Sequence, residues 1–210
     1  MKIGDYVVHI VDDEEPVRKS LAFLLTMAGF TVRVHESATG FLAEASSMTD
    51  GCLVTDLRMP DMSGVDLLTR LGAANALMPS IVISGHGDVP MAVAAMKAGA
   101  LDFIEKPFED EVLIGAIKRA AEHINGTSAA SDDTSLVLSR LDQLSERERQ
   151  VLWAVVAGQP NKAIAFDLNI SPRTVEVHRA NVMVKMQAKS LPELVRMTLA
   201  AGIGQPERRR

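Results

Sequence analysis

The amino-acid sequence predicts two domains of different fold class, an α/β domain followed by a separate all-α domain. Over residues 1–124, five short apolar runs alternate with segments of helical periodicity, which is typical of a parallel sheet covered by helices. After residue 140 only helical periodicity remains. The charge balance also changes: residues 1–124 contain 10 Lys and Arg against 18 Asp and Glu, whereas residues 140–210 contain 12 against 7. This asymmetry indicates two domains with different partners.

The first two strands and helices are bounded by residues with clear conformational preferences. The apolar run 6–11 predicts a strand, and the helix that follows has Pro16 in its first turn and ends at Gly29. Residues 31–35 alternate between apolar and polar side chains, as a strand does. Residues 37–45 are expected to form a short helix.

Three further pairs of strand and helix complete the α/β domain. The strands are expected at residues 52–56, 79–84 and 101–105, and the helices at residues 64–71, 88–99 and 108–123. Five such units predict a doubly wound, five-stranded parallel sheet with helices on both faces. With right-handed crossovers, the expected strand order is the flavodoxin-like 2-1-3-4-5.

Small and polar residues dominate residues 125–139, which we interpret as a linker. The first domain then covers residues 1–124 and the second residues 140–210. The apolar residues 136–138 at the end of the linker are compatible with the start of a helix.

The second domain is predicted to contain four helices. Ser145 and Glu148 form a capping-box pattern before a helix that ends at Gly158. The last helix is expected over residues 191–201.

The two middle helices have the pattern of a helix-turn-helix. Asn161 is expected to cap a short helix over residues 162–168. Ser171 followed by Pro172 then begins a helix that extends to about residue 186. Two short helices joined by a tight turn, the second strongly capped, are typical of this DNA-binding motif.

Polar residues stand where the predicted strands end: Asp12 and Asp13, then Asp56, Ser84 and Lys106. Each of them alone could be a helix cap, a turn or a loop residue. The C-terminal ends of parallel strands line one crevice, however, so together these groups are expected to converge. Crowded carboxylates repel one another unless a cation lies among them, and Mg²⁺ suits oxygen ligands beside a phosphate.

Asp56 is the best candidate nucleophile in this crevice. A carboxylate can attack phosphorus and form an acyl phosphate. The Lys106 ammonium would neutralise the developing charge, and the Ser84 hydroxyl could donate to a phosphoryl oxygen. Movement of Ser84 would vacate space into which Phe103 could swing, which gives a two-state switch.

The first half of the chain resembles the receiver domain of two-component response regulators. The residues that carry the resemblance are Asp12-Asp13, Asp56, Ser84 and Lys106-Pro107. The resemblance covers residues 5–124. It implies that a sensor histidine kinase phosphorylates Asp56, and that Asp12, Asp13, Asp56 and the backbone carbonyl of Arg58 hold Mg²⁺. It also implies that Ser84 and Phe103 form the switch pair and that the Lys106–Pro107 bond is cis. Ser84 departs slightly from the family pattern, in which Thr is commoner, but it retains the hydroxyl.

Residues 144–148, 161–165 and 170–178 resemble the LuxR-type helix-turn-helix. The recognition helix is then the one that begins at Ser171. The side chains expected at or near DNA are Lys162, Arg173, Thr174, Val175, His178, Arg179, Asn181 and Lys185. Lys162 is expected to contact the DNA backbone. Val175 could touch a thymine methyl or lie in the core, and both interpretations stay open.

The combination of both domains resembles the NarL/FixJ family, and residues 85–92 and 171–183 resemble its regulators of nitrogen-fixation genes. The resemblance implies activation of nitrogen-fixation or microaerobic genes, an oxygen-sensing kinase of the FixL type, and RNA polymerase as a partner. It also implies a homodimer when phosphorylated. We expect the receiver to pair through a face that includes Val93, Met96, Ala100 and Ile104.

Several classes of protein are disfavoured. The one cysteine, Cys52, cannot form an internal disulfide, and no apolar stretch is long enough to span a bilayer, so we expect a cytoplasmic protein without membrane contact. A non-enzymatic regulator is expected. An aspartyl-phosphate phosphatase would need a second carboxylate two residues after Asp56, where Arg58 stands. A DNA-binding regulator with an unused receiver is the remaining alternative.

Overall fold

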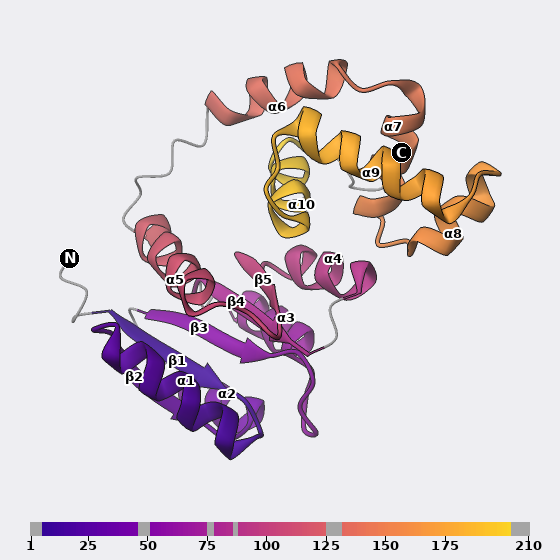
Figure 1. The fold of residues 1–210 in the computed structure, drawn as a ribbon. Coiled ribbons are helices and arrows are strands. Elements are labelled where there is room, and N and C mark those ends of the chain that lie inside the picture. Colours follow the sequence, from indigo (N-terminus) through magenta and orange to yellow (C-terminus); the bar gives the residue numbers. More distant parts are fainter. Residues whose placement is uncertain (1–5, 46–50, 75–77, 86–87, 125–131, 203–210) are drawn as a thin grey trace. The chain divides into compact units, whose positions relative to one another are not determined.

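A computed structural model describes residues 6–45, 51–74, 78–85, 88–124 and 132–202. By their contacts, the residues fall into two compact units. The first comprises residues 1–87 and 98–128, and the second comprises residues 88–97 and 129–210. Figure 1 shows the sheet of the first unit and the helices of the second. Among the described helices, none combines the length and the apolar character needed to cross a bilayer.

The first unit is built on a five-stranded parallel sheet in the order β2-β1-β3-β4-β5, which confirms the predicted topology. The strands are β1 Val7–Val11, β2 Thr31–His35, β3 Gly51–Asp56, β4 Ser80–Ser84 and β5 Asp102–Glu105. In the central strands β1, β3 and β4 every residue is buried except Val7 and Asp56, which are half-buried, as expected of a sheet that is covered on both faces.

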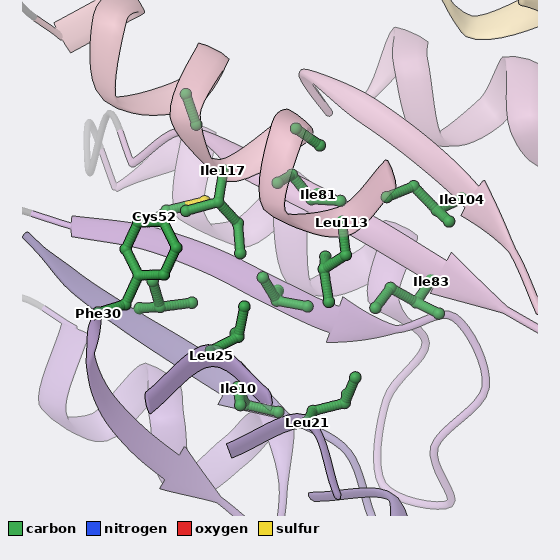
Figure 2. Packing of buried hydrophobic residues seen from close by; sticks show 14 of the residues in the cluster. Ile10, Leu21, Leu25, Phe30, Cys52, Ile81, Ile83, Ile104, Leu113 and Ile117 are labelled. Carbon is green, nitrogen blue, oxygen red and sulfur yellow. The ribbon is translucent and has the colours of Figure 1, made fainter. Parts of the chain in front are cut away.

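Helices cover the two faces of this sheet, and their bounds are α1 Glu15–Met27, α2 Ala38–Ala45, α3 Gly64–Ala73 and α5 Asp110–Ile124. On one face, apolar side chains of β1, β3 and β4 pack against α1 and α5 in a single cluster (Figure 2). Leu25 of α1 and Ile117 of α5 are fully buried in this cluster. On the other face, His9 of β1 meets the ring of Phe41 in α2.

Two glycines allow backbone arrangements that the fold needs, a turn at Gly29 and a close approach of α3 to β3 at Gly64. Gly29 has a φ of +90°, which lets the chain leave α1 and enter β2. Gly64, at the start of α3, lies so near the end of β3 that a Cβ there would stand 2.5 Å from the carbonyl oxygen of Asp56. The Gly64 N–H donates to the carbonyl of Leu57 at 2.9 Å and so closes the loop that follows Asp56.

The second unit contains α4 Val89–Lys97, α6 Asp132–Asp142, α7 Glu146–Val156, α8 Asn161–Leu168, α9 Pro172–Met186 and α10 Leu191–Ala200. Two apolar clusters hold α6 to α10 together. One joins α6, α7, α9 and α10 around Leu152 and Met186, and the other joins α7, α8 and α9 around Val151, Ile164 and Val175. The predicted helix-turn-helix is thus formed by α8 and α9.

Helix α6 extends into the segment that was expected to be a linker. It begins at Asp132, well before residue 140, and its Val137 and Leu141 are 4% and 8% exposed. These two side chains are one helical turn apart and pack with α7, α9 and α10. The end of the expected linker, residues 125–139, therefore overlaps α6, and residues 136–138 are helical, as their apolar character suggested.

An ion pair between the buried Glu148 and the partly exposed Lys185 connects the start of α7 with the end of α9. The Ser145 side chain accepts from the Glu148 N–H, and the Glu148 carboxylate accepts from the Ser145 N–H at 2.8 Å, which confirms the predicted capping box. The same carboxylate accepts from Lys185 Nζ at 2.7 Å. The hydrogen bond from Lys185, with that from Ser145, lowers the pKa of Glu148 from its usual 4.5 to about 2.

The packing of α6 predicts that Leu141→Ala destabilises the second unit by about 2–5 kcal/mol, because the substitution leaves a cavity in the core. Leu138, which is 48% exposed on the same helix, is the matched control, and Leu138→Ala should change stability by less than about 0.5 kcal/mol. The single tryptophan, Trp153, lies in α7, so urea unfolding followed by its fluorescence reports on this unit. Equal effects of both substitutions would contradict the packing of α6.

The ion pair predicts a defined loss of stability in acid. Because the folded pKa of Glu148 is depressed, its contribution is fully present above about pH 4.5 and is lost as the pH falls toward about 2. Glu148→Gln should lower the free energy of unfolding by about 2 kcal/mol at neutral pH and flatten its dependence on pH in this window. The exposed Glu146 of the same first turn provides the control, and Glu146→Gln should keep the dependence. The measurement is urea unfolding at a series of pH values.

Candidate functional site

The ends of three strands bring two carboxylates and one ammonium together. Asp12 follows β1, Asp56 ends β3, and Lys106 follows β5. Lys106 Nζ lies 2.8 Å from Asp56 Oδ1 and 3.4 Å from Asp12 Oδ2. Adjacent pairing of β1 with β3 places the two carboxylates side by side, and the long lysine side chain reaches both.

Asp12 is the buried member of this group. It is 2% exposed, its Oδ1 accepts from the N–H of Glu14 at 2.8 Å, and its carbonyl oxygen accepts from Arg18 Nη1 at 2.7 Å. Burial raises the pKa of Asp12, and this outweighs the hydrogen bond from Glu14 and the charge of Lys106, which lower it. A nearby cation would therefore stabilise the ionised form of this carboxylate.

Asp56 is the accessible member. Its side chain is 14% exposed, and its Oδ2 accepts from the N–H of Arg58 at 2.7 Å. The backbone after β3 thus turns over the carboxylate and holds one oxygen, while Lys106 holds the other. Burial alone would lower the pKa of Lys106, but the hydrogen bond and charge of Asp56, together with Asp12, raise it above its usual value. The lysine is therefore a fixed positive charge beside a carboxylate that an incoming group can reach.

The other predicted residues of the pocket occupy different environments. Ser84 ends β4 and is 1% exposed, and Phe103 on β5 is 9% exposed. Asp13 is exposed. The Lys106–Pro107 bond is cis, as the resemblance implied. Within the described part of the chain, no three carboxylate, imidazole or thiol groups lie close enough together to hold a metal, because only Asp12 and Asp56 converge, on Lys106.

The face that was expected to pair two receivers is buried in this structure. Val93, Met96, Ala100 and Ile104 are 2%, 5%, 6% and 5% exposed. Sequence periodicity had placed Val93 and Met96 together, but a helical pattern does not reveal whether such a face is covered.

The predicted DNA-binding residues separate into two groups. Arg173 and Asn181 on α9 and Lys162 on α8 are exposed, while Thr174 and His178 are half-buried. The exposed side chains carry the positive charge and the amide that phosphates and base edges recognise.

The remaining three residues are bound within the unit. Val175 is fully buried in the α7–α8–α9 cluster, so it is a core residue. Lys185 is paired with Glu148, and Arg179 Nη1 donates to Asn161 Oδ1 at 2.7 Å. The prediction that Asn161 caps α8 was wrong. Helix α8 begins at Asn161 itself, and its N-cap residue is Pro160, which makes no side-chain hydrogen bond.

Two exposed apolar side chains on α9 were missed. Val177 and Val184 are 55% and 76% exposed on the face that also carries Arg173 and Asn181. The signal was present in the sequence: once Val175 is placed in the core, a helical period of 3.6 puts Val177 on the opposite face. Valine can contact a thymine methyl in the major groove.

Comparisons with known proteins agree with both halves of the chain. The model of the response regulator receiver domain matches residues 8–118, and the model of bacterial regulatory proteins of the luxR family matches residues 142–198. The chain is 70% identical over 200 residues to the transcriptional regulatory protein FixJ of Rhizobium meliloti, with 95% of this chain and 98% of that protein covered. It is 43% identical over 192 residues to the response regulator protein TodT of Pseudomonas putida, with 91% of this chain and 85% of that protein covered.

Solved structures show the same relationship. Full-length FixJ from B. japonicum is 45% identical and superposes with a TM-score of 0.57, covering 95% of this chain and 98% of that one. The structure of FixJ-N is 72% identical, with a TM-score of 0.55, and covers 57% of this chain and 95% of that one. The chain therefore belongs to the response regulators that join a receiver domain to a luxR-family DNA-binding domain, a family of phosphorylation-activated regulators of transcription.

Proposed function

We propose that Asp56 accepts a phosphoryl group from a sensor histidine kinase and that this modification switches on promoter binding by the helical unit. The observation that carries the proposal is the pairing of a partly exposed Asp56 with Lys106 at 2.8 Å, directly beside the buried Asp12. No other described carboxylate combines access from solvent with both of these neighbours.

In the transfer, a carboxylate oxygen of Asp56 attacks phosphorus while the P–N bond of the kinase's phosphohistidine breaks. The electron pair of that bond stays on the imidazole, and an acyl phosphate forms on Asp56. The Lys106 ammonium, which already contacts Oδ1, is placed to neutralise the phosphoryl oxygens. The N–H of Arg58 holds the other oxygen and so orients the carboxylate.

The donor set of the pocket fits Mg²⁺, because it consists of hard carboxylate oxygens, one of them with a pKa raised by burial. Asp12, Asp13, Asp56 and the backbone carbonyl of Arg58 would hold the ion. When bound, it supplies positive charge that offsets the crowding of carboxylate and phosphoryl oxygens. Asp13 is exposed in this structure and is the ligand that would have to turn toward the pocket.

Ser84 and Phe103 form the proposed switch. They belong to neighbouring strands, because β4 pairs with β5 in the register Val82 to Phe103. Once a phosphoryl group is present, the Ser84 hydroxyl donates to one of its oxygens, and Phe103 occupies the space that this movement vacates. Both side chains are buried, so the change is a choice between two packed arrangements.

The switch controls assembly through the face of Val93, Met96, Ala100 and Ile104. Because these side chains are buried, pairing through them requires their prior exposure, which phosphorylation would bring about. The phosphorylated homodimer carries two α9 helices, which suits a symmetric operator with half-sites about one turn of DNA apart. RNA polymerase is the partner at the promoter.

The targets are proposed from the relatives. The relatives include transcriptional regulatory protein FixJ of Rhizobium meliloti, which is 70% identical to this chain, and nodulation protein W of Bradyrhizobium diazoefficiens, which is 39% identical. We assign activation of nitrogen-fixation or microaerobic genes and a FixL-like, oxygen-sensing kinase on this basis. A cytoplasmic location is proposed with this function, because the promoter DNA of a bacterium lies there.

Asp56→Asn removes the nucleophilic carboxylate and should abolish phosphorylation by acetyl phosphate with Mg²⁺, dimerisation with beryllofluoride, and promoter activation. Phosphate-affinity electrophoresis and sedimentation measure the first two effects. Asp66→Asn, at an exposed position in the first turn of α3, is the control and should behave like the unmodified chain. The proposal would be contradicted by an Asp56→Asn variant that still dimerises and activates promoters on treatment with acetyl phosphate and Mg²⁺.

Asn181→Ala should weaken recognition at one base pair by about 1–3 kcal/mol, since an amide can bond to a base edge in the major groove. Competition binding with duplexes that differ at single positions measures this loss. Gln143, an exposed residue between α6 and α7, is the control, and Gln143→Ala should leave the base preference unchanged. A uniform loss for all duplexes would instead identify Asn181 as a phosphate contact.

A further inference from the structure

A charged side chain lies in the buried stripe of the recognition helix. Along α9, Val175, Val182 and Met186 are 0%, 2% and 0% exposed, and their spacing defines the face that packs into the unit. Arg179 stands four residues after Val175 and three before Val182, so it belongs to this stripe. Arg173, Val177 and Asn181 lie on the other side of the helix and are exposed.

The surroundings of Arg179 agree with this placement. With Val151, Val155 and Leu191 it lines a small cavity between α7, α9 and the start of α10. Burial lowers the pKa of its guanidinium, and the nearby Glu176 only partly opposes this. A guanidinium that has lost water needs a hydrogen-bond acceptor inside the protein.

Asn161 supplies that acceptor. Arg179 Nη1 donates to Asn161 Oδ1 at 2.7 Å, across 18 positions of sequence. Asn161 is the first residue of α8, and the next residue is the exposed Lys162. The bond therefore joins the start of α8 to the middle of α9, the two helices of the DNA-binding motif.

We infer that Arg179 is a positioning residue that fixes α8 against α9 through Asn161 and does not itself contact DNA. The inference rests on the proposed DNA-binding function and deepens it. Specific binding requires the exposed face of α9 and the start of α8 to meet the DNA at the same time, so the angle between these helices matters. Non-specific binding depends mainly on the number of positive charges near phosphates and is less sensitive to that angle.

The test compares two arginines of the same helix in the full-length chain activated with beryllofluoride and Mg²⁺. The probes are a duplex that the unmodified chain enriches from a random-sequence library and a scrambled duplex of equal length. Arg179→Gln should weaken binding of the enriched duplex by about tenfold to a hundredfold, as expected when a partly buried charged hydrogen bond is removed. It should leave binding of the scrambled duplex nearly unchanged and leave the salt dependence for the enriched duplex unaltered. Arg173→Gln should instead reduce the slope of log K against log salt by about 0.9 for each phosphate that the variant no longer neutralises.

Asn161→Ala approaches the same bond from the other helix. It should weaken specific binding about as much as Arg179→Gln, and the double variant should bind little more weakly than either, because both changes remove one interaction. Fluorescence of Trp153 on unfolding shows whether each variant is folded at the assay temperature. If Arg179→Gln is not folded, Asn161→Ala alone decides the matter through its ratio of enriched to scrambled binding.

Three results would overturn the inference: a decrease of the salt slope with Arg179→Gln equal to that with Arg173→Gln, additive effects in the double variant, or equal weakening on both duplexes. The last result would mean that the pair only stabilises the fold. Failure of the unmodified, activated chain to enrich any duplex would instead refute the proposed DNA binding itself, so the two failures are distinguishable.

Discussion

The contact of Lys106 with Asp56 and Asp12 is the interaction on which the receiver unit depends. Two carboxylates at the ends of adjacent strands repel each other, and burial makes the ionised form of Asp12 more costly still. The ammonium follows the edge strand β5 and offsets this repulsion. The strand order places β3 at the centre beside β1, and β5 near enough for a lysine to reach both carboxylates. The strand order brings these three groups together, and the attraction between their opposite charges stabilises that arrangement. The proposed phosphoacceptor, Asp56, is the carboxylate of the group that solvent can reach.

Much of this architecture could be predicted because its signals are local. The apolar runs that end at Asp56 and Ser84 indicated buried parallel strands, and Gly29 indicated the end of a helix, where the structure has a positive φ. The capping box of Ser145 and Glu148 was readable from two residues three positions apart. The convergence of Asp12, Asp56 and Lys106 followed from the rule that parallel strands end at one edge. None of these inferences required knowledge of a neighbour that is distant in sequence.

The sequence did not reveal side-chain partners that are distant in sequence. Arg179 and Lys185 were predicted to lie near DNA, and in the structure Asn161 and Glu148 bind them within the unit. A basic residue on a recognition helix is available only if no acceptor of its own fold faces it, and that depends on how α8 and α7 pack. The packing of α6 is similar, because residues 136–138 were compatible with the start of a helix but did not show which of its side chains α9 and α10 would cover.

Gly64 limits the direction in which atoms around Asp56 can be displaced by the proposed phosphorylation. Its N–H closes the base of the loop after β3, and its missing side chain lets α3 abut the carbonyl of Asp56 without a gap. On that side the proposed phosphoacceptor therefore lies against the closely packed backbone at the start of α3. The proposed rearrangement of Ser84 and Phe103 lies on the other side, toward β4 and β5. A side chain at position 64 would clash with the carbonyl of Asp56 and push α3 away from β3, so it would open a second direction for the proposed displacement.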